Sequence, residues 1–107
     1  PLALKWGQDS GAGLVRALAA ITSEPVRALG TSLGSLAASA GRLVEGGVAD
    51  VCVFDPDEHW QALPSALKSQ GKHTPFAPEH TGFTLPGRVK ATLVAGTVAY
   101  EDPAAAA

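Results

Sequence analysis

The change of residue pattern at Gly30 is the feature that most restricts the fold of this 107-residue chain. Before it, Leu14, Leu18 and Ile21 recur at the spacing of one face of an amphipathic helix. After it come short β-branched and aromatic runs that are separated by glycine and proline. The sequence therefore predicts an α+β chain, with helices in residues 1–30 and strands beyond.

Capping residues divide the helical part into three predicted segments. Gly7 is expected to close a first helix, and Ser10 is a candidate N-cap for the second. Pro25 is expected in the first turn of a third helix, where its missing N–H costs little, and Gly30 is expected to stop that helix.

Three later segments carry a strand signal. Residues 50–55 are β-branched and aromatic, and Pro56 is expected to end that strand. Residues 88–94 and 97–101 are apolar runs that meet at Ala95-Gly96, which predicts a hairpin. Four further expectations concern the remaining segments: one or two short strands in residues 31–49, another in 59–63, irregular structure in 71–86, and a frayed end from residue 102.

The composition argues against several classes of function. The net charge is −2 and the eight basic residues are scattered, which disfavours a nucleic-acid or anionic-membrane surface. No apolar run approaches the roughly 18 residues of a membrane span. The single cysteine, Cys52, excludes an internal disulfide and fits a reducing cytoplasm. Because the chain opens on Pro1 without a Met, we expect it to be a piece of a longer polypeptide.

The three histidines do not have the spacing of a metal site. His59, His73 and His80 are separated by 14 and 7 residues, all in loop-like sequence. Structural zinc sites usually pair ligands about two to five residues apart, often with cysteines. The sequence favours solvated or interface histidines, and we predict no metal ligands in this chain.

Nucleophiles and carboxylates also have simpler interpretations. Cys52 lies in the middle of a predicted strand, where a buried cysteine is usually a small hydrophobic residue. Asp55, Asp57 and Glu58 follow that strand around a proline, which favours a turn with an aspartate cap over an acid/base pair. We therefore predict no catalytic and no cofactor-binding residue in this chain.

Two stretches, taken in order, resemble cyclic amidohydrolases. "ITSEPVRALG" (21–30) resembles the proline-containing helix that follows the barrel in that superfamily. "GRLVEGGVADVCVFDP" (41–56) resembles the next element, Gly-x-Leu-x-x-Gly-x-x-Ala-Asp-x-x-x-x-Asp, in which a returning strand enters the small β domain.

A third stretch narrows the resemblance to dihydroorotases. Trp60, Ser69 and "HTPF" (73–76), followed by Gly82, Leu85 and Gly87, are similar to the ending of that family. His73 replaces the family's Asn, and the loop before Leu85 is longer. The resemblance covers about residues 1–101.

The resemblance implies a particular fold. It makes residues 1–30 the terminal helices of an amidohydrolase (β/α)₈ barrel (a TIM barrel), residues 31–103 the C-terminal strands of the small β domain, and residues 104–107 a tail. "HTPF" becomes a structural latch, in which Pro75 fixes φ and Phe76 is buried against the barrel. The family's metal-binding motifs lie upstream and are not in this chain.

The resemblance also implies a function for the parent protein. That protein would be a zinc-dependent hydrolase of the cytoplasm, a dihydroorotase that interconverts N-carbamoyl-L-aspartate and L-dihydroorotate in pyrimidine biosynthesis. The alternative is a non-catalytic dihydroorotase-like subunit that scaffolds aspartate transcarbamoylase. A hydantoinase or allantoinase ranks below both, because those families carry different residues where "HTPF" stands.

Partners follow from the same resemblance. The chain is expected to pack against the rest of its own barrel domain, to be part of an oligomer and, in the alternative interpretation, to bind aspartate transcarbamoylase. No zinc is expected in this chain. Thirty helical residues and a few short strands make a thin core, so we predict that residues 1–107 alone are inactive and not a self-sufficient monomer.

Overall fold

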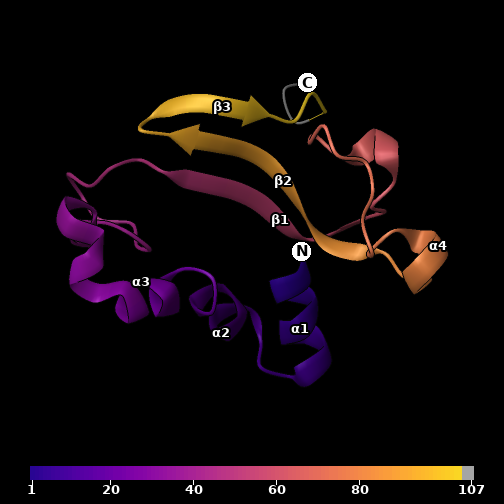
Figure 1. Cartoon of the computed structure of the whole chain (residues 1–107), viewed down its shortest axis with the longest axis horizontal. Helices are drawn as coiled ribbons and strands as arrows, with labels where there is room; N and C mark the ends of the chain where they lie inside the picture. The colour runs from indigo at the N-terminus through magenta and orange to yellow at the C-terminus, as the bar shows by residue number, and fades with distance from the viewer. Residues whose placement is uncertain (105–107) are drawn as a thin grey trace.

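A layer of short helices lies beside an antiparallel sheet of three strands in the computed structural model, which describes residues 1–104 (Figure 1). The helical elements are α1 (Leu2–Ser10), α2 (Leu14–Ala19), α3 (Ser23–Leu29), the 3₁₀ helix η1 (Gly30–Ala38), η2 (Pro64–Ala66) and α4 (Pro78–Thr81). The strands are β1 (Val51–Trp60), β2 (Leu85–Val94) and β3 (Thr97–Glu101). The α+β prediction is thus confirmed.

Helix α1 continues past the residue that was expected to end it. It runs to Ser10 and ends at Gly11, which has a φ of 75° and donates its backbone N–H to the Gln8 carbonyl. Gly7 is buried instead, and a Cβ there would lie 2.8 Å from the Ala17 Cβ. The prediction for Gly7 was therefore wrong, because its lack of a side chain serves the close packing of α1 on α2 rather than a helix end.

The other helix boundaries are partly as predicted. Ser10 is not the N-cap of α2, which is Gly13; the Ser10 hydroxyl instead accepts the Ala12 N–H. Pro25 lies in the first turn of α3, and α3 ends at Leu29 before Gly30, as predicted.

Helical structure continues beyond Gly30, where strands were expected. Residues 30–38 form η1, with a kink at Gly34, whose φ is 59°. In the described part of the chain no strand precedes Val51, so the short strands expected in residues 31–49 are wrong. Alanine and leucine favour helical turns in this segment, and no neighbouring strand is present to pair with it.

The predicted apolar stripe of the second helix is not buried. Leu14 and Ile21 are 46% and 59% exposed, and Ile21 lies beyond the end of α2. The side chain of α2 that is fully buried is Ala17, which lies against Gly7 of α1. The larger apolar side chains of this region therefore remain available for further packing.

Strand β1 is longer than predicted because it passes through its proline. Asp55 pairs with Arg88 and His59 pairs with Pro86, and the register shifts between these two pairs. Pro56 lies in that irregular segment, where strand pairing does not need a backbone N–H from it. Of the strand expected in residues 59–63, only residues 59 and 60 are in a strand, as the end of β1, and residues 61–63 are irregular.

The hairpin between β2 and β3 is confirmed. Ala95 and Gly96 have φ values of 49° and 82°, which suit a two-residue turn of the primed type. Strand β2 begins at Leu85, so the irregular segment predicted for 71–86 is shorter than expected and also contains α4. Near the start of β2, the Trp60 indole N–H donates a hydrogen bond to the Gly87 carbonyl (3.1 Å).

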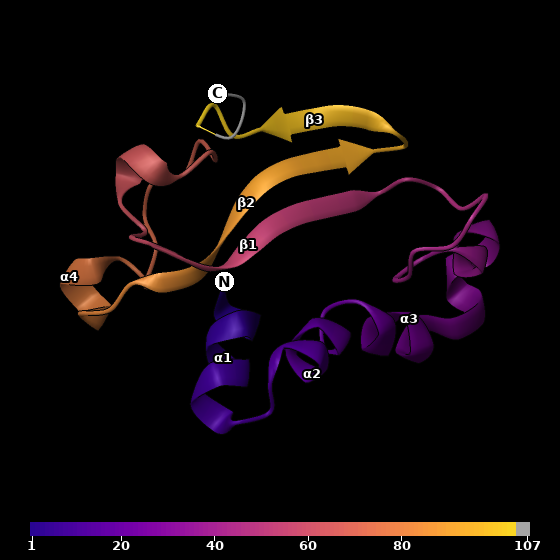
Figure 2. The same cartoon turned by 180° about the vertical axis from the view of Figure 1, so that it is seen from behind.

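Helix α1 joins the helical layer to the sheet, because it packs on both α2 and β2 (Figure 2). Leu4 is 7% exposed and lies against Gly87, which has a φ of 92°. A Cβ at Gly87 would overlap the Leu4 side chain. Gly87 therefore provides both the backbone conformation and the space for this contact.

The end of β3 is anchored by a buried carboxylate. Asp102 is 1% exposed, and its carboxylate accepts a hydrogen bond from Arg88 Nε (3.0 Å). Its backbone N–H donates to the Lys90 carbonyl (2.8 Å), and Lys90 in turn pairs with Glu58. The frayed end expected from residue 102 is therefore wrong for residues 102–104, and residues 105–107 of the expected tail lie outside the described residues.

We predict that Gly87→Ala lowers the free energy of unfolding by about 2–3 kcal/mol, because a methyl group must displace Leu4 and strain a positive φ. Urea unfolding followed by circular dichroism measures this change. Gly71→Ala is the matched control, since a Cβ at Gly71 meets open space, and it is expected to stay within about 0.5 kcal/mol. Equal effects of the two substitutions would contradict the role given to Gly87.

We also predict that Asp102 makes stability depend on pH. The hydrogen bond from Arg88, then that from the Ala104 N–H, lowers the pKa of the Asp102 carboxyl below its ordinary 3.8. This contribution is complete above the ordinary pKa and is lost as the pH falls through the lowered folded-state pKa. Asp102→Asn should therefore lower the melting temperature at neutral pH, and the difference from wild type should shrink in acid.

The control for Asp102 is Asp9→Asn. Asp9 pairs with Lys5 at 2.8 Å, but its side chain is 62% exposed, and exposed pairs contribute little to stability. We expect a smaller change in melting temperature from this variant at every pH. A difference between wild type and Asp102→Asn that persists unchanged in acid would refute the assignment.

Candidate functional site

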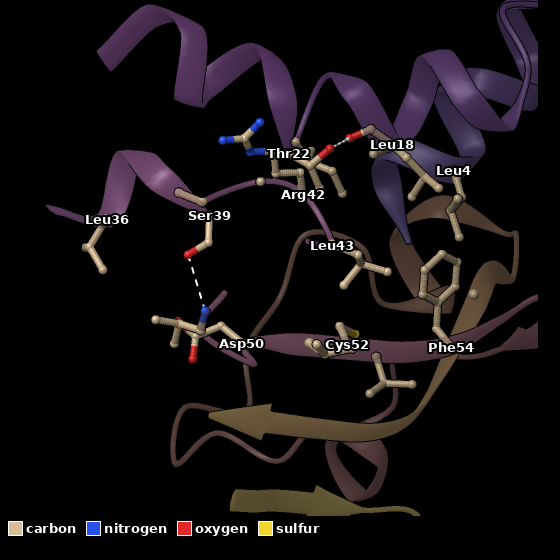
Figure 3. A pocket seen from close by; sticks show the side chains of 18 of the residues that line it. Leu4, Leu18, Thr22, Leu36, Ser39, Arg42, Leu43, Asp50, Cys52 and Phe54 are labelled. Atoms are coloured by element: carbon tan, nitrogen blue, oxygen red, sulfur yellow. Dashed lines mark hydrogen bonds between the residues drawn. The ribbon is translucent and has the colours of Figure 1, made fainter. Parts of the chain in front are cut away.

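An open concavity of about 660 Å³ lies between the helical layer and the sheet. We call it the helix–sheet cavity. Figure 3 shows Leu4, Leu18, Leu43 and Phe54 pointing into this space. Its apolar lining comes from three parts of the chain: Leu4, Leu18, Ile21 and Leu36 of the helical region, Leu43 and Val48 of the following loop, and Cys52, Phe54 and Val89 of the sheet.

The polar side chains around this cavity are engaged with nearby backbone. The Thr22 hydroxyl donates to the Leu18 carbonyl (2.6 Å), and the Ser39 hydroxyl accepts the Val48 N–H (3.3 Å) (Figure 3). Arg42 donates to the Ala38 carbonyl (2.6 Å). The helix–sheet cavity therefore offers apolar surface rather than a set of groups arranged for acid/base or nucleophilic chemistry.

Cys52 lines this cavity and is exposed, which contradicts its predicted burial. The physical reason is that Cys52 projects from the face of β1 that borders this open cavity. The sequence run around Cys52 is typical of a strand covered on both faces, but the described residues leave this side chain uncovered.

The carboxylates after the strand signal have structural roles. The Asp55 carboxylate accepts the Asp57 N–H (2.9 Å), which confirms the predicted aspartate cap. This cap lies inside β1, so the turn that was expected after the strand is wrong. Glu58 lies beside Lys90 and within 3.7 Å of Arg88. Asp102 also belongs to this charge network, and the sequence analysis did not identify it. In the sequence it is only an aspartate before a proline near the end of the chain.

The structure brings two of the three histidines to one place. His73 and His80 line a second cleft of about 470 Å³, whereas His59 lies on β1 near the Asp57 carbonyl (3.2 Å). Across residues 1–104, no cluster of three or more His, Cys, Asp or Glu side chains could hold a metal ion. The described residues therefore do not fit the zinc that the family resemblance implies for the parent.

The "HTPF" segment forms a local turn. The Thr74 hydroxyl accepts the Phe76 N–H (3.2 Å), and the Phe76 side chain is 36% exposed. Its predicted burial against a barrel stays a prediction.

None of the helices formed by the described residues is long and apolar enough to cross a membrane.

Comparisons with known proteins relate this chain to one family of enzymes. No family model and no solved structure matches the chain. A dihydroorotase of Geobacter sp. (strain M21) is 32% identical over 101 residues, which are 94% of this chain and 21% of that protein. A dihydroorotase of Syntrophus aciditrophicus is 44% identical over 62 residues, covering 58% of this chain and 14% of that protein.

A third relative carries a different name. The dihydroorotase-like protein of Pseudomonas aeruginosa is 38% identical over 101 residues, again 94% of this chain and 21% of the relative. The relatives are thus named as dihydroorotases, which are hydrolases, or as dihydroorotase-like proteins. The chain belongs with the dihydroorotases and dihydroorotase-like proteins, and it spans about a fifth of the length of these relatives.

The helix–sheet cavity generates a prediction with a matched control. Leu43 lines the cavity and is 85% exposed, whereas Val15 is 84% exposed and does not line it. We expect a neutral apolar dye such as Nile red to bind the chain, and Leu43→Glu to reduce the fluorescence increase severalfold. Val15→Glu should leave the increase unchanged. Equal losses in the two variants would show that the dye reports general surface apolarity.

Proposed function

We propose that this chain is the structural, non-catalytic C-terminal portion of a dihydroorotase-like amidohydrolase. In this proposal the helix–sheet cavity packs against the remainder of that polypeptide, which contains the barrel. The observation that carries the proposal is an open apolar cavity in a chain that is similar over 94% of its length to proteins about five times longer. The cytoplasm is the proposed compartment.

The burial of apolar side chains supports this proposal. Among the described residues the buried apolar side chains are Leu4, Ala17, Ala62, Leu85 and Pro86, which make a small core. Leu36 and Ile21 line the helix–sheet cavity while remaining 53% and 59% exposed. Fully burying one such side chain contributes about 1.5–3 kcal/mol, so a partner that filled the cavity would add substantially to a marginal core.

The chemistry of the parent is proposed from the family alone. Dihydroorotases interconvert N-carbamoyl-L-aspartate and L-dihydroorotate, and ring closure of the former releases water. The described residues hold no group of His, Cys, Asp and Glu side chains that could bind zinc. We therefore assign no step of the reaction to them, and their proposed contribution is to support the barrel.

A chimera tests this function. This chain would replace the aligned stretch of the Geobacter sp. dihydroorotase, and turnover would be compared with that of the parent and of a deletion that lacks the stretch. We expect the chimera to keep turnover within about tenfold of the parent, a barrier change of about 1.4 kcal/mol. The deletion and residues 1–107 alone should show none.

The same chimera reports whether the helix–sheet cavity is covered. Cys52 should react readily with iodoacetamide in the isolated chain, because it is exposed, and much more slowly in the chimera. Mass spectrometry of the peptide that contains Cys52 distinguishes it from other cysteines. Equal alkylation in both proteins, or tightly bound stoichiometric zinc in the isolated chain, would count against the proposal.

The second candidate function is a non-catalytic subunit that scaffolds aspartate transcarbamoylase. The observation behind it is that one relative, 38% identical over 101 residues, is named a dihydroorotase-like protein rather than a dihydroorotase. It predicts that an intact polypeptide carrying this chain co-elutes with aspartate transcarbamoylase and shows no dihydroorotase turnover. Turnover without co-elution contradicts it.

A further inference from the structure

The second cleft, which we call the histidine cleft, lies apart from the helix–sheet cavity. It is lined by Ala62, Pro64, Lys72, His73, Thr74, Pro75, Ala77, Glu79 and His80. Figure 1 shows α4 and the segment before it at the end of the sheet farther from α3. No residue lines both spaces, so a binding role for the histidine cleft does not depend on the proposed function.

Nitrogen donors dominate the polar lining of the histidine cleft. Lys72, His73 and His80 contribute an ammonium group and two imidazoles, against the single carboxylate of Glu79. That carboxylate lies 3.5 Å from His80 Nε2, close enough to pair with this imidazole when it is protonated. The surplus of donors fits an anion rather than a cation.

The loop around the histidine cleft is held in place by its own hydrogen bonds. Lys72 Nζ donates one hydrogen bond to the Leu67 carbonyl (2.7 Å), which positions the ammonium group and leaves its other two protons free. The Thr74 hydroxyl oxygen accepts the Phe76 N–H, and its own proton remains available. Pro75 and Pro78 restrict the backbone, which lowers the entropic cost of binding a ligand.

We propose that the histidine cleft binds a small dianion, either a phosphate or a dicarboxylate, through Lys72, His73 and His80. Its volume of about 470 Å³ accommodates an ion of this size with its remaining water. Because the side chains are exposed, with 61% exposure at His80, the expected dissociation constant is on the order of millimolar.

Histidine modification on the full 107-residue chain tests this site. Diethyl pyrocarbonate acylates accessible imidazoles, and mass spectrometry gives the rate at each histidine. Inorganic phosphate and malonate would be titrated separately at constant ionic strength and neutral pH. At saturation we expect about threefold or greater slowing at His73 and His80, with His59 unchanged as the internal control.

Three variants complete the test. Lys72→Gln should weaken the protective effect about threefold to fivefold, and Glu79→Gln should produce protection at lower anion concentration. Lys68→Gln removes the same charge from a lysine that does not line the cleft, and it should change nothing. Protection by phosphate alone identifies a phosphate site, and protection by malonate alone identifies a carboxylate site; either result supports the proposal.

Two results would overturn the proposal. The first is no protection by either anion, which would show that the histidine cleft is only a surface feature of the loop. The second is equal slowing at His59, His73 and His80, or equal effects of Lys72→Gln and Lys68→Gln, since both would show non-specific screening by the added salt.

Discussion

The contact between Leu4 and Gly87 holds the two layers of this chain together. Helix α1 packs on both α2 and β2, and Leu4 reaches the sheet where a side chain on residue 87 would exclude it. On the other side of α1, the absence of a side chain at Gly7 leaves room for Ala17 of α2. Two glycines therefore set the distances of α1 from its neighbours. A side chain at either position would push α1 away from α2 or from the sheet.

The sheet depends on a second constraint, which is electrostatic. Arg88 and Lys90 on β2 lie between Glu58 of β1 and Asp102 after β3. This network ties both edge strands to the central strand at the same end of the sheet. The buried Asp102 carboxylate is stabilised because hydrogen bonds from Arg88 and Ala104 compensate for its removal from water.

These constraints leave much apolar surface uncovered, and this connects structure to the proposed role. The helix–sheet cavity is bordered by leucine, isoleucine and phenylalanine, with polar groups that are engaged locally. Such a surface is suited to packing against protein rather than to chemistry. The similarity to a fifth of the length of dihydroorotases provides a polypeptide of the right kind to cover it, and the histidine cleft lies elsewhere.

Local rules were sufficient for some elements of this chain. The hairpin at Ala95-Gly96, the end of α3 at Gly30 and the Asp55 cap depend on preferences of a few neighbouring residues, so they were predictable from the sequence. The motifs in residues 21–30, 41–56 and 73–76 also identified the family. Only the tertiary structure decided the roles of Gly7, Cys52 and Asp102, because burial and ion pairing depend on segments distant in sequence.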